Sequence, residues 1–348
     1  MTTRLPLSMS AVETQPLPAT RLELGYDKNL MLFAGRGNPE LAAKIASKLG
    51  IEPGPLTLKT FTNGEVYCKF GESVRGADVF IVQPTCANPV TGMSPNDALM
   101  ELMIMIDAAV GASAHRVIAV MPWFGYSRQD KKSAPREPIS ARLVARALES
   151  AGADRVLTMD LHAGQIQGFF SKPVDHMTAL FILTQHFIDL NLPDVVVVAP
   201  DAGRVKLNKK FASKLGADLA ILDKERPAQQ VAEIGYIIGD VKGKTAIIVD
   251  DIIDTATTLR VAGQAVLDAG ARAVYAAATH PVMSGPAFEN IAASRFEQIV
   301  VTDTVPLTPG APSNITQLSC ADLLTDSIRS IFSDRSVSDV FGGENQLF

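Results

Sequence analysis

Short apolar runs rich in β-branched residues alternate with amphipathic stretches along most of the chain. Runs of roughly four to eight such residues are typical of strands that a sheet buries on both faces. They predict strands at 29–35, 78–84, 115–122, 154–160, 194–200, 245–251 and 273–280. Apolar residues at helical spacing predict helices at 39–50 and near 96–110, 138–150, 176–190, 204–215, 257–269 and 321–332.

The alternation of strands with helices predicts an α/β fold whose parallel sheets are covered by helices. A chain of 348 residues is longer than one core usually serves, which favours two domains. We therefore predict two similar domains, each a mainly parallel sheet flanked by helices. Their expected ranges are 28–172 and 173–335, between a flexible tail at 1–27 and a C-terminal segment at 336–348.

Two distant stretches resemble each other. Residues 147–156 and 265–274 each read as a helix that ends in Ala-Gly-Ala before a strand. An internal duplication explains this likeness, and so does the general use of glycine to end helices. One match of this kind leaves both explanations open.

The composition narrows the class of protein. The chain is 47% hydrophobic and 20% charged with a net charge of −5, so no overall basic charge points to nucleic acid. Cys68, Cys86 and Cys320 are too scattered for a disulfide framework or a zinc site, which favours a reducing compartment. Because no run of about eighteen apolar residues occurs, we expect a cytoplasmic protein without membrane or nucleic-acid partners.

The stretch IIVDDIIDTATTL, residues 247–259, joins an apolar run to three carboxylates and a cluster of hydroxyls. We expect the strand to end at Asp250 and Asp251, because ligands bind beyond the carboxyl ends of parallel strands. Hydroxyls and free amides at the next helix suit a phosphate, whereas the acids suit sugar hydroxyls or a divalent cation. A phosphorylated sugar satisfies both halves. The alternative, a helix cap at Asp254 or Thr255, leaves the first two acids unexplained.

Two further loops carry candidate nucleotide contacts. Residues 125–138 concentrate Lys and Arg beside aromatic side chains, which suits a base and its phosphates, although solvated loops have the same composition. The sequence FTNGEVY (61–67) is typical of a hairpin, with Asn63-Gly64 as a two-residue turn.

Candidate metal ligands and cations follow other strands. His162 lies beside Asp160, and Asp201 follows another strand; with phosphate oxygens they suit Mg²⁺, although a lone histidine is more often structural. In ILDKERP (221–227), Lys224 and Arg226 would point the same way from an extended segment, whereas composition alone predicts a surface turn.

These motifs in this order resemble the ribose-phosphate pyrophosphokinases, a branch of the type I phosphoribosyltransferase-like proteins. The resemblance runs from about residue 29 to SVSDVF (336–341) and is carried by FTNGEVYCKF, NDALMELMIMIDA, GYSRQDKK, MDLHAGQIQGFF, VVAPDAG, ILDKERP, DDIIDT and THPVMSGPA. It implies an enzyme that transfers the diphosphoryl group of ATP to the anomeric hydroxyl of ribose 5-phosphate. The products would be AMP and 5-phosphoribosyl 1-diphosphate, for nucleotide biosynthesis.

The resemblance also implies roles for individual residues. The catalytic cations would be Lys224 and Arg226, and His162 and Asp201 would hold Mg²⁺. The implied ATP contacts are Phe61, Asn63, Gly64, Glu65, Arg128 and Gln129, with those of the 61–65 loop reaching a neighbouring subunit's nucleotide. The implied ribose 5-phosphate contacts are Arg226, Asp250, Asp251, Asp254, Thr255, Ala256, Thr257 and Thr258.

The resemblance implies a ring of dimers, a hexamer, regulated by phosphate and ADP between subunits. Ser336, Ser338 and Phe341 match a segment that borders this regulatory site, but a helix start capped by Ser338 fits the same residues.

Two residues depart from the family pattern. Thr257 replaces a glycine, so we expect ordinary dihedrals there or strain, because β-branched residues resist a positive φ. Arg204 stands where many members have a small residue, which would alter a diphosphate-binding turn.

Two alternative functions remain. A phosphoribosyltransferase would have one domain and no ATP site, and a synthetase-associated regulatory subunit would lack the catalytic groups. The chain's length and its Lys224, Arg226, His162 and three acids favour the enzyme.

Overall fold

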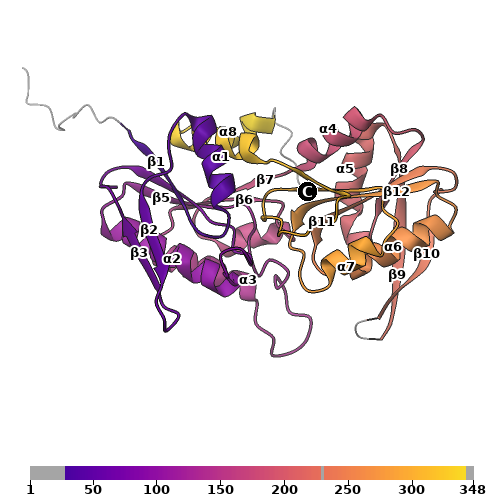
Figure 1. Cartoon of the computed structure of the whole chain (residues 1–348), viewed down its shortest axis with the longest axis horizontal. Coiled ribbons are helices and arrows are strands. Elements are labelled where there is room, and N and C mark those ends of the chain that lie inside the picture. The colour runs from indigo at the N-terminus through magenta and orange to yellow at the C-terminus, as the bar shows by residue number, and fades with distance from the viewer. Residues whose placement is uncertain (1–27, 229–230, 342–348) are drawn as a thin grey trace, which may run out of the picture.

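The computed structural model describes residues 28–228 and 231–341, with the side chains of 224–228, 231–235 and 341 left out. Two sheets lie end to end (Figure 1). The first is wholly parallel, in the order β1-β4-β5-β6-β7, with β1 Leu30–Ala34, β4 Asp78–Val82, β5 Arg116–Met121, β6 Arg155–Met159 and β7 Val174–Met177.

The second sheet has the order β10-β9-β8-β11-β12-β13-β14 and is parallel except for β10, which pairs antiparallel with β9. Its strands are β8 Val195–Ala199, β9 Asp218–Ala228, β10 Val231–Ile238, β11 Thr245–Ile253, β12 Ala273–Pro281, β13 Gln298–Thr302 and β14 Ile315–Leu318. The predicted α/β class with two mainly parallel sheets is therefore confirmed.

The helices between the strands cover both faces of each sheet. They are α1 Pro39–Leu49, α2 Pro95–Gly111, α3 Ser140–Ala151, α4 Leu180–Leu190, α5 Val205–Leu215, α6 Thr257–Asp268, α7 Ala287–Ala292 and α8 Ala321–Phe332, with short 3₁₀ turns η1 Gly164–Phe169, η2 Ala202–Arg204 and η3 Val337–Phe341. The helix predicted near 176–190 starts later, because Val174–Met177 pairs with β6 as a strand. Within the described ranges, no helix is both long and apolar enough to cross a membrane.

The predicted hairpin at 61–67 is present, but its turn differs from the prediction. Strands β2 Leu56–Thr60 and β3 Val66–Phe70 pair antiparallel, with Thr60 opposite Val66. A two-residue type I′ turn needs positive φ at both central residues. Here Gly64 has a positive φ of 91°, whereas the φ of Asn63 is not positive. The Gly64 amide donates to the Phe61 carbonyl. The turn is thus a longer loop that uses one left-handed glycine.

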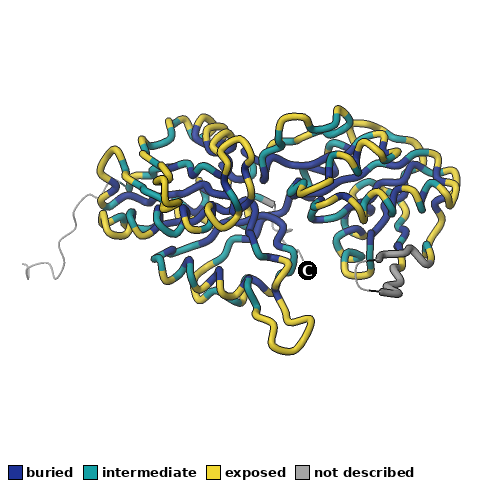
Figure 2. The backbone as a smooth tube through the Cα atoms, turned by 60° about the horizontal axis from the view of Figure 1, so that its bottom comes forward, coloured by how far each residue is buried: buried dark blue, intermediate teal, exposed yellow. Residues whose placement is uncertain are grey.

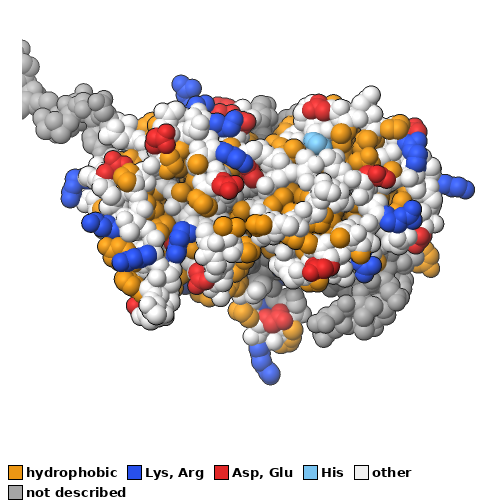
Figure 3. All heavy atoms as spheres, in the orientation of Figure 1, with side chains coloured by type: hydrophobic (Ala, Val, Ile, Leu, Met, Phe, Trp, Pro, Cys, Tyr) orange, Lys and Arg blue, Asp and Glu red, His pale blue; other side chains and the backbone are white. Residues whose placement is uncertain are grey.

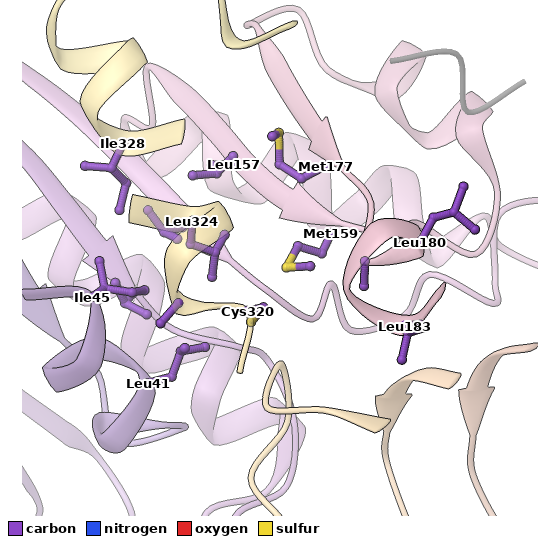
Figure 4. Close-up of a cluster of buried hydrophobic side chains, with 14 of the residues drawn as sticks. Leu41, Ile45, Leu157, Met159, Met177, Leu180, Leu183, Cys320, Leu324 and Ile328 are labelled. Atoms are coloured by element: carbon purple, nitrogen blue, oxygen red, sulfur yellow. The ribbon is translucent and has the colours of Figure 1, made fainter. Parts of the chain in front are cut away.

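One core runs through both halves of the molecule. On one face, α1 and α8 cover the first sheet and α4 and α5 the second, and their buried side chains form a continuous cluster. Figure 4 shows part of it, from Leu41 and Ile45 through Leu324 and Ile328 to Leu180 and Leu183. Separate clusters lie under α2 and α3, and under α6 and α7, on the opposite faces. In Figure 2 the buried backbone follows the strands.

The structural division departs from the predicted ranges in two places. Strand β7 pairs with β6, so a boundary after residue 172 would separate it from its own sheet. Helix α8 was predicted in the second domain, yet it packs beside α1 over the first sheet (Figure 1). Neither feature can be read from the local sequence, because β7 is short and polar and an amphipathic pattern does not show which sheet a helix covers.

On the face shown in Figure 3, acidic and basic side chains are interspersed.

Candidate active site

A cavity of about 330 Å³ lies where the two halves of the molecule meet. Arg128, from the loop after β5, and His162, from the loop after β6, line it from the first half. The second half contributes the end of β8, the end of β11 and the start of α6. Its lining residues there are Pro200, Asp201, Arg204, Ile248, Asp250, Asp251, Ile252, Ile253, Asp254, Thr255, Ala256, Thr258, Leu259, Ala262 and Ala277.

The first two acids of DDIIDT lie inside β11 and not at its end, which corrects the sequence prediction. β11 pairs with β12 as far as Ile253, opposite Pro281. Because the ladder continues past the acids, their side chains have the fixed geometry of strand residues. Asp250 is partly accessible, with 28% of its side chain exposed, whereas the side chain of Asp251 is 5% exposed.

The loop between β11 and α6 turns on Ala256. This residue adopts a left-handed conformation, with φ 57° and ψ 4°, and is the N-cap of α6 without a side-chain cap. The alternative of a helix cap at Asp254 or Thr255, which the sequence favoured less, is therefore excluded. Thr257 starts the helix with ordinary dihedrals. The left-handed residue is Ala256, one position before the threonine that the sequence marked as a candidate for strain. A non-glycine residue in this region costs about 1–2 kcal/mol.

Asn290 of α7 braces this loop, although no motif in the sequence marks it as a site residue. Its Nδ2 donates to the Thr255 carbonyl at 2.9 Å and to the Thr257 hydroxyl at 3.2 Å. The Thr255 and Thr257 hydroxyls are themselves 3.2 Å apart. The start of α6 lines the cavity through Ala256, Thr258 and Leu259, and the first amides of a helix have no partner within the helix itself. Asn290 could have been predicted only by knowing that α7 packs beside this loop, because the two are far apart in the sequence.

Cations from several loops pair with the acids. Arg128 contacts Asp254 at 2.7 Å across the junction between the halves. Arg204, at the end of η2, contacts Asp251 at 2.7 Å and Asp250 at 3.4 Å. In the sequence Arg204 stands out only as a departure from the pattern of the resembled family, because its place at the centre of the site depends on the fold.

The pKa values of the two neighbouring carboxyls are shifted in opposite directions. Burial and the negative charge of Asp251 raise the pKa of Asp250 well above its usual range. Burial would also raise the pKa of Asp251, but His162 and Arg204 outweigh it and hold that pKa below its usual range. The arrangement therefore favours a charge on Asp251 and less charge on Asp250.

Some of the predicted site residues lie away from the cavity, and the side chains of others are not among the described residues. The loop of Phe61, Asn63, Gly64 and Glu65 is on the β2–β3 hairpin, at the end of the molecule away from β9 and β10 (Figure 1). Gln129 accepts from the Ser140 hydroxyl at 2.6 Å. The side chains of Lys224 and Arg226 lie outside the described residues, but their backbone belongs to β9 and corrects the surface turn predicted for 221–227.

The described part of the C-terminal segment contains a short 3₁₀ helix, η3. Ser336 and Ser338 have hydroxyls 2.5 Å apart, and Ser338 lies inside η3, so it does not cap the start of a helix. The side chain of Phe341 lies outside the described residues.

Comparison with known proteins decides the family. A family model described as the N-terminal domain of ribose phosphate pyrophosphokinase matches residues 30–152, and one described as a phosphoribosyl synthetase-associated domain matches residues 226–342. Ribose-phosphate pyrophosphokinases from Chlorobaculum tepidum and Caldanaerobacter subterraneus subsp. tengcongensis are 49% and 51% identical to this chain. Each alignment covers 91% of this chain, and 96% and 99% of the relative. The chain belongs to the ribose-phosphate pyrophosphokinase family.

A solved family structure agrees with this assignment. The phosphoribosylpyrophosphate synthetase from Mycobacterium smegmatis has a TM-score of 0.82 and 45% sequence identity, covering 88% of this chain and 100% of that one. The match extends over both sheets, as expected for a pyrophosphokinase of this family.

Proposed function

We propose that this chain transfers the diphosphoryl group of ATP to the anomeric hydroxyl of ribose 5-phosphate, releasing AMP and 5-phosphoribosyl 1-diphosphate. The observation that carries the proposal is the cavity that both halves of the molecule line. Its wall joins acids, hydroxyls and a helix start from one half to Arg128 and His162 from the other. A sugar phosphate and a nucleotide phosphate chain need both kinds of surface at one place.

Ribose 5-phosphate is held at the β11–α6 loop. The amides at the start of α6 and the hydroxyls of Thr255, Thr257 and Thr258 receive the 5-phosphate, which a helix N-terminus favours. Asp250 and Asp254 accept from the sugar hydroxyls, and the left-handed Ala256 turns the loop so that both groups of donors and acceptors face one ligand. Arg226 adds a cation on the phosphate side.

ATP lies toward the first half, where Arg128 and Gln129 contact its phosphates. The loop of Phe61, Asn63, Gly64 and Glu65 is remote from the cavity of its own chain, which supports a contribution to the cavity of a neighbouring subunit. We therefore propose an oligomer, a hexamer by family resemblance, with phosphate and ADP as regulators. Metabolite substrates and the free thiols Cys68, Cys86 and Cys320 support a cytoplasmic location.

The residues present fit Mg²⁺. His162 and Asp201 place one imidazole and one carboxylate on the cavity wall. Among the described residues no group of three or more His, Cys, Asp or Glu forms a metal cage. That donor set suits an ion that takes few protein ligands and keeps water and phosphate oxygens. Bound there with ATP, the ion would neutralise charge on the transferring group.

The chain's own residues orient the reaction. The sugar's O1 attacks the β-phosphorus, the bond from that phosphorus to the α-phosphate oxygen breaks, and AMP departs with the electron pair. The O1 proton passes to solvent as the new bond forms. Lys224 and Arg226 stabilise the charge that develops on the transferring and leaving oxygens, because phosphoryl transfer depends mainly on positioning and fixed cations.

Phosphorus NMR of the purified protein with Mg²⁺, ATP and ribose 5-phosphate tests the proposal. AMP together with a diphosphate on C1 of the ribose is the expected result. ADP in place of AMP would mean transfer of one phosphoryl group and would refute the mechanism. Nucleotide binding without turnover would favour the synthetase-associated regulatory subunit, and consumption of 5-phosphoribosyl 1-diphosphate with a base would favour a phosphoribosyltransferase.

Replacing Lys224 with alanine tests the catalytic assignment. We expect kcat to fall by about 10²–10³, the usual cost of losing one electrostatic donor in an active site, with ATP and ribose 5-phosphate binding retained. Lys242→Ala, which removes an exposed cation from the same half, should leave kcat unchanged. A Lys224 variant of near-normal rate would rule out the assigned role.

A further inference from the structure

We propose that Asp251 is a positioning residue for His162 and not a ligand of the sugar. The proposal deepens the function proposed above and rests on it. The sequence resemblance groups Asp250, Asp251 and Asp254 together as sugar contacts, but their surroundings differ. Asp250 and Asp254 expose 28% and 23% of their side chains, whereas Asp251 exposes 5%.

Both carboxylate oxygens of Asp251 already have protein partners. Oδ1 forms an ion pair with an Arg204 terminal nitrogen at 2.7 Å, and Oδ2 lies 2.8 Å from the Nδ1 of His162. A sugar hydroxyl would have to displace one of these charge-assisted contacts inside a buried site. The neighbouring Asp250 is the more accessible acceptor on the same strand.

The contact with Asp251 selects one form of the His162 ring. A carboxylate accepts hydrogen bonds and does not donate them, so the 2.8 Å contact is a hydrogen bond when Nδ1 carries the hydrogen. In the neutral ring this leaves Nε2 with the lone pair that a metal ion needs. The Arg204 nitrogen also lies 2.8 Å from Nδ1, but in this form of the ring it has no acceptor there and is held by its 2.7 Å ion pair with Asp251.

Arg204 fixes the same histidine from the other side. A second terminal nitrogen of its guanidinium donates to the backbone carbonyl of His162 at 3.3 Å. Arg204 therefore anchors the backbone of His162 while Asp251 orients its ring. A carboxylate that accepts from the far nitrogen of a metal-binding histidine is a common arrangement, and its loss typically lowers metal affinity about 10–100-fold.

Two isosteric variants separate the roles of the neighbouring acids. Binding of Mn²⁺ alone is measured by electron paramagnetic resonance, and binding of ribose 5-phosphate by calorimetry. Asp251→Asn should weaken Mn²⁺ about 10–100-fold and change the sugar-phosphate affinity by less than about threefold. Asp250→Asn should weaken ribose 5-phosphate about tenfold, the usual cost of leaving one buried hydrogen-bonding group without its partner, with a smaller effect on Mn²⁺. The reverse pattern, or equal loss of sugar affinity in both variants, would overturn the proposal.

The unaltered protein offers a second measurement that does not depend on how well the variants fold. Nitrogen-15 NMR of labelled histidine has few signals, because the chain has 5 histidines, and His162→Gln identifies the relevant one. A protonated Nδ1 and an unprotonated Nε2 are expected without metal; the opposite form would contradict the proposal. None of these measurements uses turnover. A chain that failed to make 5-phosphoribosyl 1-diphosphate would refute the proposed function while leaving the result for Asp251 readable.

Discussion

Ala256 carries a conformation that its side chain disfavours. Its left-handed φ of 57° turns the chain from β11 into α6 and so aims the phosphate-binding end of the helix. An alanine there costs about 1–2 kcal/mol, and such strain persists where the surroundings determine the backbone. Here those surroundings include Asn290, which holds the loop on both sides of Ala256.

Ala256→Gly should therefore stabilise the protein. Relief of strain exceeds the extra entropy that glycine gives the unfolded chain, so we expect the free energy of unfolding to rise by about 0.5–1 kcal/mol. Urea unfolding measures it. Ala262→Gly, inside the same helix, should lower stability by about 1 kcal/mol or more. A loss of stability in both variants would show that position 256 is not strained.

His176 predicts a pH dependence of stability. Burial lowers the pKa of His176 to about 4. The charge of Asp160 opposes this shift, and His280 adds to it. The unfolded residue, with a pKa near 6.5, binds a proton that the folded residue does not. The contribution of His176 to the free energy of unfolding is therefore fully present above about pH 6.5. It is lost as the pH drops toward 4, which lowers the free energy of unfolding by on the order of 3 kcal/mol.

Urea unfolding at several pH values measures this effect, and His176→Gln should flatten the change between pH 6.5 and 4. An unchanged slope in the variant would assign the loss of stability to other groups, such as the buried His280, whose pKa burial also lowers.

Helix α1 shows how an element predicted from local signals acquires a long-range role. Asn38 caps it, accepting from the Leu41 amide at 3.1 Å, and Gly50 ends it in a left-handed conformation. The Asn38 amide also donates to the Asp303 carbonyl at 2.8 Å, at the end of β13 in the other half. The cap is thus also a link between the two sheets.

Two substitutions separate these roles of Asn38. Asn38→Ser keeps a capping oxygen and loses the bond to Asp303, which leaves a buried carbonyl unpaired and should cost about 1–3 kcal/mol. Asn38→Ala loses both and should cost about 1 kcal/mol more. Thermal or urea unfolding gives both values; equal losses would mean that the cap contributes nothing.

At the scale of the whole molecule, one core joins the two halves. The cluster that includes α1, α8, α4 and α5 is continuous from the first sheet to the second, and α8 returns from the end of the chain to cover α1. A continuous core couples the unfolding of one half to that of the other.

Leu324→Ala tests this coupling. Leu324 is fully buried in α8, so its truncation should cost about 2–5 kcal/mol, and calorimetry should still show one unfolding transition at a lower temperature. Leu143→Ala, at an exposed position of α3, should change stability by less than about 0.5 kcal/mol. Two separate transitions in the Leu324 variant would mean that the halves unfold independently.

The sequence by itself determined the local features and the family. The buried strands, the cap of α1, the order of the motifs and the two mainly parallel sheets all follow from patterns within a few dozen residues. The short or polar strands, such as β7, were not predicted, because pairing with a neighbour holds them in place more than their own apolar residues do.

The tertiary structure decided what depends on residues far apart in the chain. Pairing with β12 extends β11 beyond its two acids, the left-handed conformation falls on Ala256, and α8 packs against α1. The tertiary structure also brought Arg204, His162 and Asp251 into contact and so distinguished two adjacent aspartates that look alike in sequence. Side-chain type is a local property, but exposure and hydrogen-bond partners are set by whatever the fold packs beside each residue.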